Sequence, residues 1–100
     1  MIYCFDYDNV ICDTEGTDYE NAVPKEENIR KINALYYGGC HITIFTGRGS
    51  VSGIDWRSLT EKQLSVWGVN YHELIFGKPN YDIFIDDKAW NVREFEEGRI

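Results

Sequence analysis

Four short apolar runs, each followed by polar or charged residues, constrain the fold of this 100-residue chain more than any other feature. The runs are rich in β-branched and aromatic residues and occupy residues 1–5, 41–45, 73–76 and 83–85. Strands that are apolar on both faces suit a parallel sheet, and strands that alternate with helices form right-handed βαβ units. The pattern predicts a single α/β domain over residues 1–100.

Helix-type patterns lie between or after these runs. The first begins at Pro24, continues through acidic residues that complement the helix dipole, and ends at Gly38 and Gly39. Thr60 and Gln63 resemble a capping box at the start of a second helix. A third helix is predicted from the apolar residues Ala89, Trp90, Val92 and Phe95. The polar stretch between residues 7 and 23 predicts a loop with room for a small hairpin.

Composition excludes several classes of protein. The net charge of −7 and the lack of a basic cluster argue against binding to nucleic acid or to an anionic membrane. No apolar run approaches the roughly 18–20 residues of a membrane span, and the N-terminus lacks the features of a signal peptide. The cysteines Cys4, Cys12 and Cys40 form no C-x-x-C pair and are typical of thiols in a cytoplasmic protein. We therefore expect a cytoplasmic location.

Polar side chains stand just past the end of every apolar run. They are Asp6 and Asp8, then Thr46, then Lys78, then Asp86 and Asp87. In an open parallel sheet the carboxyl ends of the strands share one edge, where ligands bind. We therefore expect these side chains to line a single crevice.

This set of residues suggests phosphoryl chemistry with a divalent cation. Clustered carboxylates need positive charge beside them, and Lys78 supplies only one. Mg²⁺ prefers oxygen ligands and shares them with substrate phosphates, whereas zinc and copper favour clustered His or Cys. Lys78 and Thr46 would hold a phosphoryl group, Asp6 would attack phosphorus as a nucleophile, and Asp8 would serve as general acid and base.

Four motifs resemble those of the haloacid dehalogenase (HAD) superfamily, in the order that the family shows. They are Phe5-Asp6-Tyr7-Asp8-Asn9-Val10, Ile44-Phe45-Thr46-Gly47-Arg48, Gly77-Lys78-Pro79 and Phe84-Ile85-Asp86-Asp87. The resemblance implies a Rossmann-like α/β/α core of three layers, with a parallel sheet of about four strands in the order 3-2-1-4. The segments between the motifs are too short for a cap domain.

The resemblance also implies roles for individual residues. Asp6 would be the nucleophile and a Mg²⁺ ligand, Asp8 the general acid and base with its carbonyl on the metal, and Asp86 a further ligand supported by Asp87. Thr46, Gly47, Lys78 and Asn9 would bind the phosphoryl oxygens. Arg48, Trp56 and Arg57 follow the second strand and are candidate contacts of the leaving group. Where the family commonly has Gly-Thr, this chain has Asn9-Val10.

The predicted activity is Mg²⁺-dependent hydrolysis of a small-molecule phosphate ester through an aspartyl phosphate. Residues between Trp56 and Pro79 further resemble small HAD phosphatases of capsule or surface-polysaccharide synthesis, which implies a phosphorylated metabolite or capsule precursor as substrate. Two alternatives stay open. One is a receiver-like phosphoacceptor domain, although the order of the acidic pair and the lysine differs from that of receivers. The other is a metal-binding module without catalytic activity.

Overall fold

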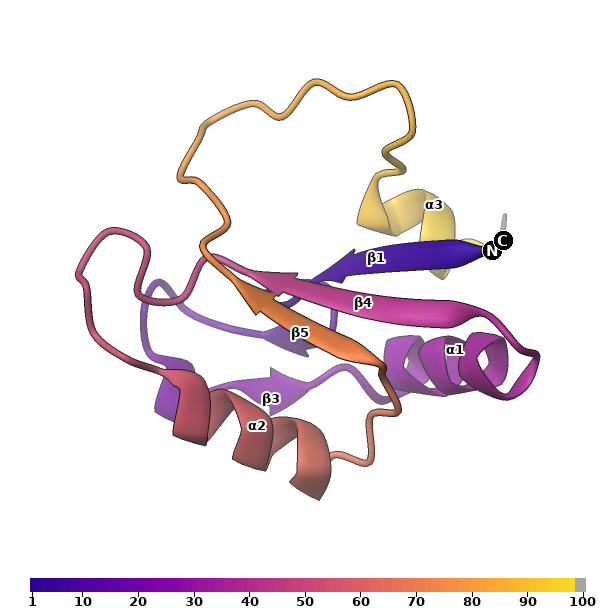
Figure 1. Ribbon diagram of the computed structural model, residues 1–100, viewed down its shortest axis with the longest axis horizontal. Helices are drawn as coiled ribbons and strands as arrows, with labels where there is room; N and C mark the ends of the chain where they lie inside the picture. The colour runs from indigo at the N-terminus through magenta and orange to yellow at the C-terminus, as the bar shows by residue number, and fades with distance from the viewer. Residues whose placement is uncertain (99–100) are drawn as a thin grey trace.

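The computed structural model describes residues 1–98 and has a parallel three-stranded sheet at its centre (Figure 1). The strands are β1 (Ile2–Asp6), β4 (His41–Thr46) and β5 (Glu73–Phe76), in the spatial order β1-β4-β5. The predicted α/β class is confirmed, and these three strands lie in the predicted relative order. Their carboxyl ends meet at the same edge of the sheet because all three run in one direction.

The helices α1 (Glu26–Tyr37), α2 (Arg57–Val66) and α3 (Val92–Glu96) supply the second layer. Alternate strand residues point to one face, where Phe5, Ile42 and Ile44 are buried. They share one apolar core with residues of all three helices, namely Ile29 and Ile32 of α1, Leu64 of α2 and Phe95 of α3. The ring of Phe95 meets that of Phe5 edge-on, with centroids 5.3 Å apart.

The opposite face of the sheet has no helix layer within the described residues, so the predicted three-layer arrangement is not what the structure shows. We call this the uncovered face; it carries Ile2, Cys4, Phe45 and Ile75. Ile2 is 77% exposed and Ile75 is 42% exposed. The physical reason is that the apolar stripes of all three helices are taken up by a single core. Parallel sheets are normally covered on both faces.

A short antiparallel pair follows β1 and confirms the predicted small hairpin. It joins β2 (Cys12–Asp13) to β3 (Val23–Pro24), with the 3-10 turn η1 (Tyr19–Asn21) between them. Pro24 therefore belongs to β3, and α1 begins two residues later than the sequence suggests. The backbone N–H of Lys25 donates to the carbonyl of Ile11 at 2.8 Å, which fixes this pair beside the end of β1.

The predicted capping box is wrong. Helix α2 begins at Arg57, with Trp56 at the N-cap position, so Thr60 and Gln63 lie inside the helix. Both residues are buried: Thr60 has no exposed surface, and Gln63 is 7% exposed. They face the loop after β4, where they act as hydrogen-bond partners of an arginine described below.

The predicted fourth strand is also wrong. Residues 83–85 form no strand; Ile83 is 79% exposed and Ile85 is 91% exposed. They belong to an extended segment, residues 80–91, that stands clear of β1 and that we call the arch (Figure 1). Just before the arch, the backbone N–H of Lys78 donates to the carbonyl of Thr46 at 3.1 Å. At the other end of the arch, Asn91 caps α3. The segment is apolar enough for a strand, but no strand among the described residues is hydrogen-bonded to it. Helix α3 starts after Ala89 and Trp90, later than predicted.

A search of the described residues for a helix both long and apolar enough to cross a bilayer finds none.

Candidate functional site

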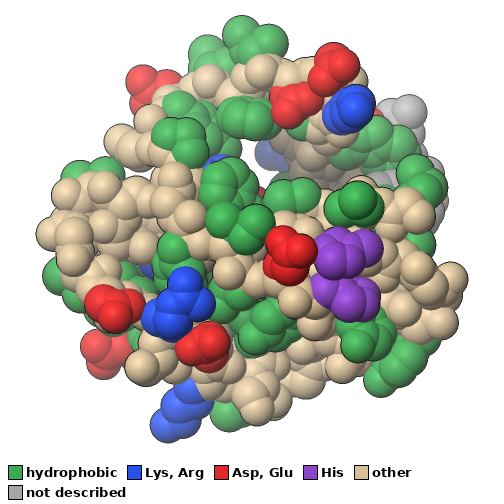
Figure 2. Space-filling view, in the orientation of Figure 1, with side chains coloured by type: hydrophobic (Ala, Val, Ile, Leu, Met, Phe, Trp, Pro, Cys, Tyr) green, Lys and Arg blue, Asp and Glu red, His purple; other side chains and the backbone are tan. Residues whose placement is uncertain are grey.

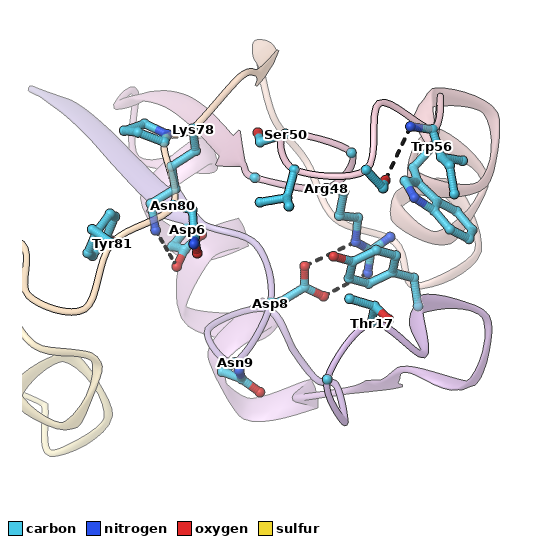
Figure 3. A pocket seen from close by; sticks show the side chains of 18 residues that line it. Asp6, Asp8, Asn9, Thr17, Arg48, Ser50, Trp56, Lys78, Asn80 and Tyr81 are labelled. Carbon is cyan, nitrogen blue, oxygen red and sulfur yellow. Dashed lines mark hydrogen bonds and ion pairs between the residues drawn. The ribbon is translucent and has the colours of Figure 1, made fainter.

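A cavity of about 590 Å³ opens at the carboxyl ends of the strands (Figure 3). The loops after β1, β4 and β5 form its wall, as the sheet topology predicts, together with residues of the segment between β2 and β3. It gathers residues from distant parts of the sequence, which include the predicted site residues Asp6, Asp8, Asn9, Gly47, Arg48, Trp56 and Lys78. We call this cavity the site pocket.

Asp6 and Lys78 form an ion pair in the wall of the site pocket. The Nζ atom of Lys78 lies 2.8 Å from Oδ2 of Asp6, and the backbone N–H of Tyr7 donates to Oδ1 at 2.8 Å. The Asp6 side chain keeps 39% of its surface exposed, so a ligand in the pocket can reach it. Burial lowers the pKa of Lys78, but its bonds to Asp6 and Tyr81 outweigh that effect and raise the pKa above its usual value. Lys78 is therefore a stable positive charge beside Asp6.

Asp8 is held by a second cation, Arg48. Nε of Arg48 donates to Oδ2 of Asp8 at 3.1 Å, and a terminal nitrogen donates to Oδ1 at 2.9 Å. The hydroxyl of Thr14 donates to Oδ1 at 2.6 Å, and the thiol of Cys12 lies 3.6 Å from the same oxygen. Burial raises the pKa of Cys12 to about 11, so the thiol remains protonated. Both oxygens of Asp8 are thus occupied.

Arg48 is enclosed on all sides. Its other terminal nitrogen donates to Oγ1 of Thr60 at 3.1 Å and to Oε1 of Gln63 at 2.7 Å. Its guanidinium carbon lies 4.1 Å from the ring centroid of Tyr7 and 4.6 Å from that of Tyr19. With none of its side chain exposed, Arg48 orients Asp8 instead of contacting a leaving group, and the structure corrects that expectation.

Thr46 and Gly47 follow β4 directly but differ in their access to the site pocket. Thr46 is fully buried, and its hydroxyl oxygen accepts the N–H of Arg48 at 3.1 Å. Gly47 lines the pocket; a Cβ atom there would lie 3.2 Å from the carbonyl oxygen of Lys78. A side chain at this position would therefore need the second and third loops to move slightly apart.

The two remaining candidates for leaving-group contact are placed differently. Trp56 lines the site pocket, and its ring meets that of Tyr19 edge-on with centroids 5.0 Å apart. Arg57 lies outside the pocket wall, with its guanidinium 4.5 Å from the ring centroid of Phe76. Asn9 lines the pocket and has a positive φ of 67°, the one such non-glycine residue between residues 1 and 98.

Asp86 and Asp87 lie on the arch and are not brought to Asp6 and Lys78. Both are exposed, and the backbone N–H of Lys88 donates to Asp86, which lowers the pKa of this carboxyl below its usual value. A second cavity of about 1180 Å³ separates the arch from β1, and both Asp6 and Asp86 line it. We call it the hollow, and it is visible in the space-filling view (Figure 2).

The residues as placed do not fit the predicted magnesium site. Within residues 1–98, no three side chains of His, Cys, Asp or Glu come together closely enough to hold a metal ion. Asp6 is turned to Lys78 and Asp8 is turned to Arg48 (Figure 3). Asp86 lies on the arch, across the hollow from Asp6. A site built from Asp6 and Asp86 needs these two carboxylates to approach each other.

Several pocket residues were not predicted from the sequence. Thr17 and Ser50 supply hydroxyl groups, Asn80 an amide, and Tyr19 and Tyr81 aromatic rings. They stand in loops that follow the motifs and have no periodic pattern. For Asn80 and Tyr81, nearness to Lys78 in the sequence is a clue; Thr17, Tyr19 and Ser50 lie in the segments 10–23 and 47–56, where the sequence led us to expect substrate specificity without naming residues.

One comparison with known proteins gave a match. The chain is similar to the crystal structure of an MCSG target from Vibrio cholerae, with a TM-score of 0.83 and 26% sequence identity over 94% of this chain and 85% of that one. No protein-family model and no curated protein matches. The match supports the α/β fold and supplies no function.

Proposed function

We propose that the chain is a phosphomonoester hydrolase of the HAD type, with Asp6 as its nucleophile. The observation that carries the proposal is the Asp6–Lys78 pair at the carboxyl end of β1, open to a pocket that also holds Asp8. A partly exposed carboxylate beside a fixed ammonium offers both a nucleophile and a positive charge for phosphoryl oxygens. The four motifs in family order support the same reaction.

In the first step, Oδ2 of Asp6 attacks phosphorus while the bond from phosphorus to the ester oxygen breaks. Lys78 sits where it can stabilise the negative charge on the transferring group, since its Nζ is 2.8 Å from the attacking oxygen. Water then attacks the aspartyl phosphate, which releases inorganic phosphate and restores Asp6.

Asp8 is the proposed general acid and base. In the second step its carboxylate accepts a proton from the attacking water, and Arg48 keeps it oriented toward the site pocket. Giving a proton to the leaving oxygen in the first step requires Asp8 to loosen its bond to Arg48. Good leaving groups need this proton least.

The lining of the site pocket indicates the leaving group. Apart from Asp6, Asp8, Arg48 and Lys78, every lining residue is uncharged, and the two cations are already paired with the two acids. The lining combines hydroxyl and amide groups with aromatic rings, which suits a neutral polyhydroxylated group such as a sugar or polyol. The lining residues therefore include no unpaired cation that could bind a second phosphate group. A volume of about 590 Å³ is ample for such a ligand.

Phosphate release from p-nitrophenyl phosphate and from a panel of sugar and polyol phosphates tests the proposal. Asp6→Asn should abolish turnover, whereas Asp13→Asn, an exposed acid on β2, should leave it unchanged. Release in the presence and absence of Mg²⁺ tests the predicted cofactor. Near-normal turnover by Asp6→Asn would overturn the mechanism.

Substrate preference is tested with the same assay. Hexose and polyol phosphates should be preferred over phosphate esters whose leaving group carries a second phosphate or a carboxylate. Thr17→Val and Ser50→Ala should each lower kcat/KM for a hexose phosphate about twofold to tenfold, the range for one lost hydrogen bond, and leave p-nitrophenyl phosphate unaffected. Equal use of anionic leaving groups would contradict this part of the proposal.

A second candidate function is a phosphoacceptor domain. The closed set of partners around Asp8 favours it, because an acid with both oxygens occupied delivers a proton slowly. Incubation with acetyl phosphate distinguishes the two. A phosphoaspartate that persists for hours, with no ester hydrolysis, would indicate the acceptor; rapid release of phosphate would indicate the hydrolase.

A further inference from the structure

The ammonium group of Lys78 contacts a second residue besides Asp6, the arch residue Tyr81. Its Nζ lies 5.0 Å from the ring centroid of Tyr81, within the roughly 6 Å over which an aromatic ring attracts a cation. Against the lowering effect of burial, hydrogen bonds to Asp6 and then to Tyr81 raise the pKa of Lys78. Lys78 is therefore held by two groups, a carboxylate and a phenol.

Tyr81 stands where the site pocket meets the hollow, and it lines both cavities. Its ring packs against that of Phe84 on the arch, with centroids 5.2 Å apart. Figure 3 shows Tyr81 and Trp56 on opposite sides of the ion pair between Asp6 and Lys78. Trp56 is a candidate contact of the leaving group, so Tyr81 is placed to act on Lys78 instead.

The bond between Lys78 and Asp6 cannot last through the proposed reaction. Oδ2 of Asp6, which lies 2.8 Å from Nζ of Lys78, is the atom that becomes bonded to phosphorus. The aspartyl phosphate has no negative charge left on the acyl group of Asp6, so Lys78 loses its ion-pair partner there. A lysine side chain is flexible and loses much rotamer freedom when it is held in one place. Lys78 therefore needs a second contact that takes no part in bond making.

We propose that Tyr81 is a positioning residue, which keeps the ammonium group of Lys78 at the phosphoryl group through both steps of the reaction. This inference rests on the proposed function. The ring and the hydroxyl group of Tyr81 are not consumed in either step, so their contact with Lys78 persists when Asp6 is phosphorylated. Tyr81 itself exchanges no proton and forms no covalent bond.

The reactivity of the Lys78 amine tests the contact without any activity measurement. Only the unprotonated amine reacts with acetic anhydride, so trace labelling at about pH 8, read by mass spectrometry, reports how firmly each lysine keeps its proton. Tyr81→Phe keeps the ring and removes the hydroxyl group. Labelling of Lys78 in this variant should rise about twofold or more relative to Lys62, an exposed lysine on α2, because a lower pKa leaves more of the amine unprotonated.

A matched control removes a hydroxyl group elsewhere. Tyr37 is 76% exposed at the end of α1 and belongs to the lining of neither cavity. Tyr37→Phe should leave the labelling of Lys78 unchanged. Unchanged labelling of Lys78 in Tyr81→Phe would overturn the proposal. Tyr81 is 39% exposed, and circular dichroism of each variant checks that the fold is intact.

Comparison of two substrates separates positioning of Lys78 from contact with the leaving group. Lys78 acts on the phosphoryl group, which every ester shares. Tyr81→Leu should therefore lower kcat/KM for p-nitrophenyl phosphate and for a hexose phosphate by the same factor. We expect about a fivefold loss or more, from the removal of a cation–π contact and of a hydrogen bond to a charged group. Tyr81→Phe, which keeps the ring, should lose less on both esters.

The outcomes distinguish this inference from the proposed function. Unequal losses on the two esters would assign Tyr81 to the leaving group and overturn the positioning role, as would full activity of Tyr81→Leu. Absence of wild-type activity on every ester would instead overturn the proposed function. The labelling experiment would still decide whether Tyr81 holds Lys78.

Discussion

Arg48 donates two parallel N–H···O hydrogen bonds, of 3.1 and 2.9 Å, to the carboxylate of Asp8, and the Arg48 side chain has no exposed surface. Removing one partner of such a pair leaves the other charge poorly solvated. Arg48→Gln should destabilise the protein by about 3 kcal/mol, at the low end for a buried pair because Asp8 retains 22% exposure. Urea unfolding followed by circular dichroism measures this loss.

A matched variant shows whether the loss of stability in Arg48→Gln comes from the burial of its ion pair. Arg30 also pairs with an acid, Glu27, but both side chains are about 70% exposed. Arg30→Gln should change the free energy of unfolding by no more than about 0.5 kcal/mol. Similar losses in the two variants would mean that the enclosure of Arg48 contributes no stability.

Asp8 itself distinguishes between classes of ester in the proposed reaction. Asp8→Asn should lower kcat for an alkyl phosphate at least tenfold more than for p-nitrophenyl phosphate, since an alkoxide needs a proton to leave and a nitrophenolate does not. Steady-state phosphate release on both esters measures the ratio. Equal losses on the two esters would remove Asp8 from the role of general acid.

Asn9 supports the turn between Asp8 and β2 in a left-handed conformation, with φ of 67°. Asparagine tolerates this region better than most residues, and glycine tolerates it best. Asn9→Ala should therefore cost about 1 kcal/mol of unfolding free energy, whereas Asn9→Gly should stay close to the wild type. Chemical unfolding of the three proteins decides; equal stabilities of the Ala and Gly variants would show that the turn relaxes.

The three strands and the polar residues at their ends are predictable because their signals are local. A run such as residues 41–45 specifies a strand by its own composition, and parallel topology brings Asp6 and Lys78 to one edge. The bond between Arg48 and Asp8 is not predictable in this way. It depends on where two loops direct their side chains and on Thr60 and Gln63, which resemble a capping box in the sequence.

The fourth strand shows the limit of local patterns more clearly. Residues 83–85 have the composition of a strand, but a strand exists only with a hydrogen-bonded neighbour, and composition does not name that neighbour. The same holds for the missing second helix layer, since the helix patterns do not say which face of the sheet each helix covers. The unpaired segment 83–85 and the uncovered face of the sheet both depend on how the elements pack in three dimensions, which local sequence patterns do not specify.

Glu96 ties α3 to the start of α1 and makes the fold sensitive to acid. Its Oε2 accepts hydrogen bonds from Asn28 at 2.7 Å and from Lys25 at 3.1 Å, and these bonds, that of Asn28 first, lower the pKa of Glu96 below its usual 4.5. A carboxyl whose pKa is lower in the folded state stabilises the fold above pH 4.5, and this contribution disappears as the pH falls through the folded-state pKa.

Because the Glu96 side chain is 36% exposed, the expected gain in unfolding free energy is only about 0.5 kcal/mol. Glu96→Gln should therefore be less stable than wild type at neutral pH, and the difference should shrink as the pH falls below 4.5 and vanish once it is below the folded-state pKa. Glu97→Gln removes the same charge from the exposed next residue and serves as the matched control. Thermal unfolding of the three proteins over this pH range measures the effect; a difference between Glu96→Gln and wild type that persists in acid would mean that Glu96 acts through packing and not through its charge.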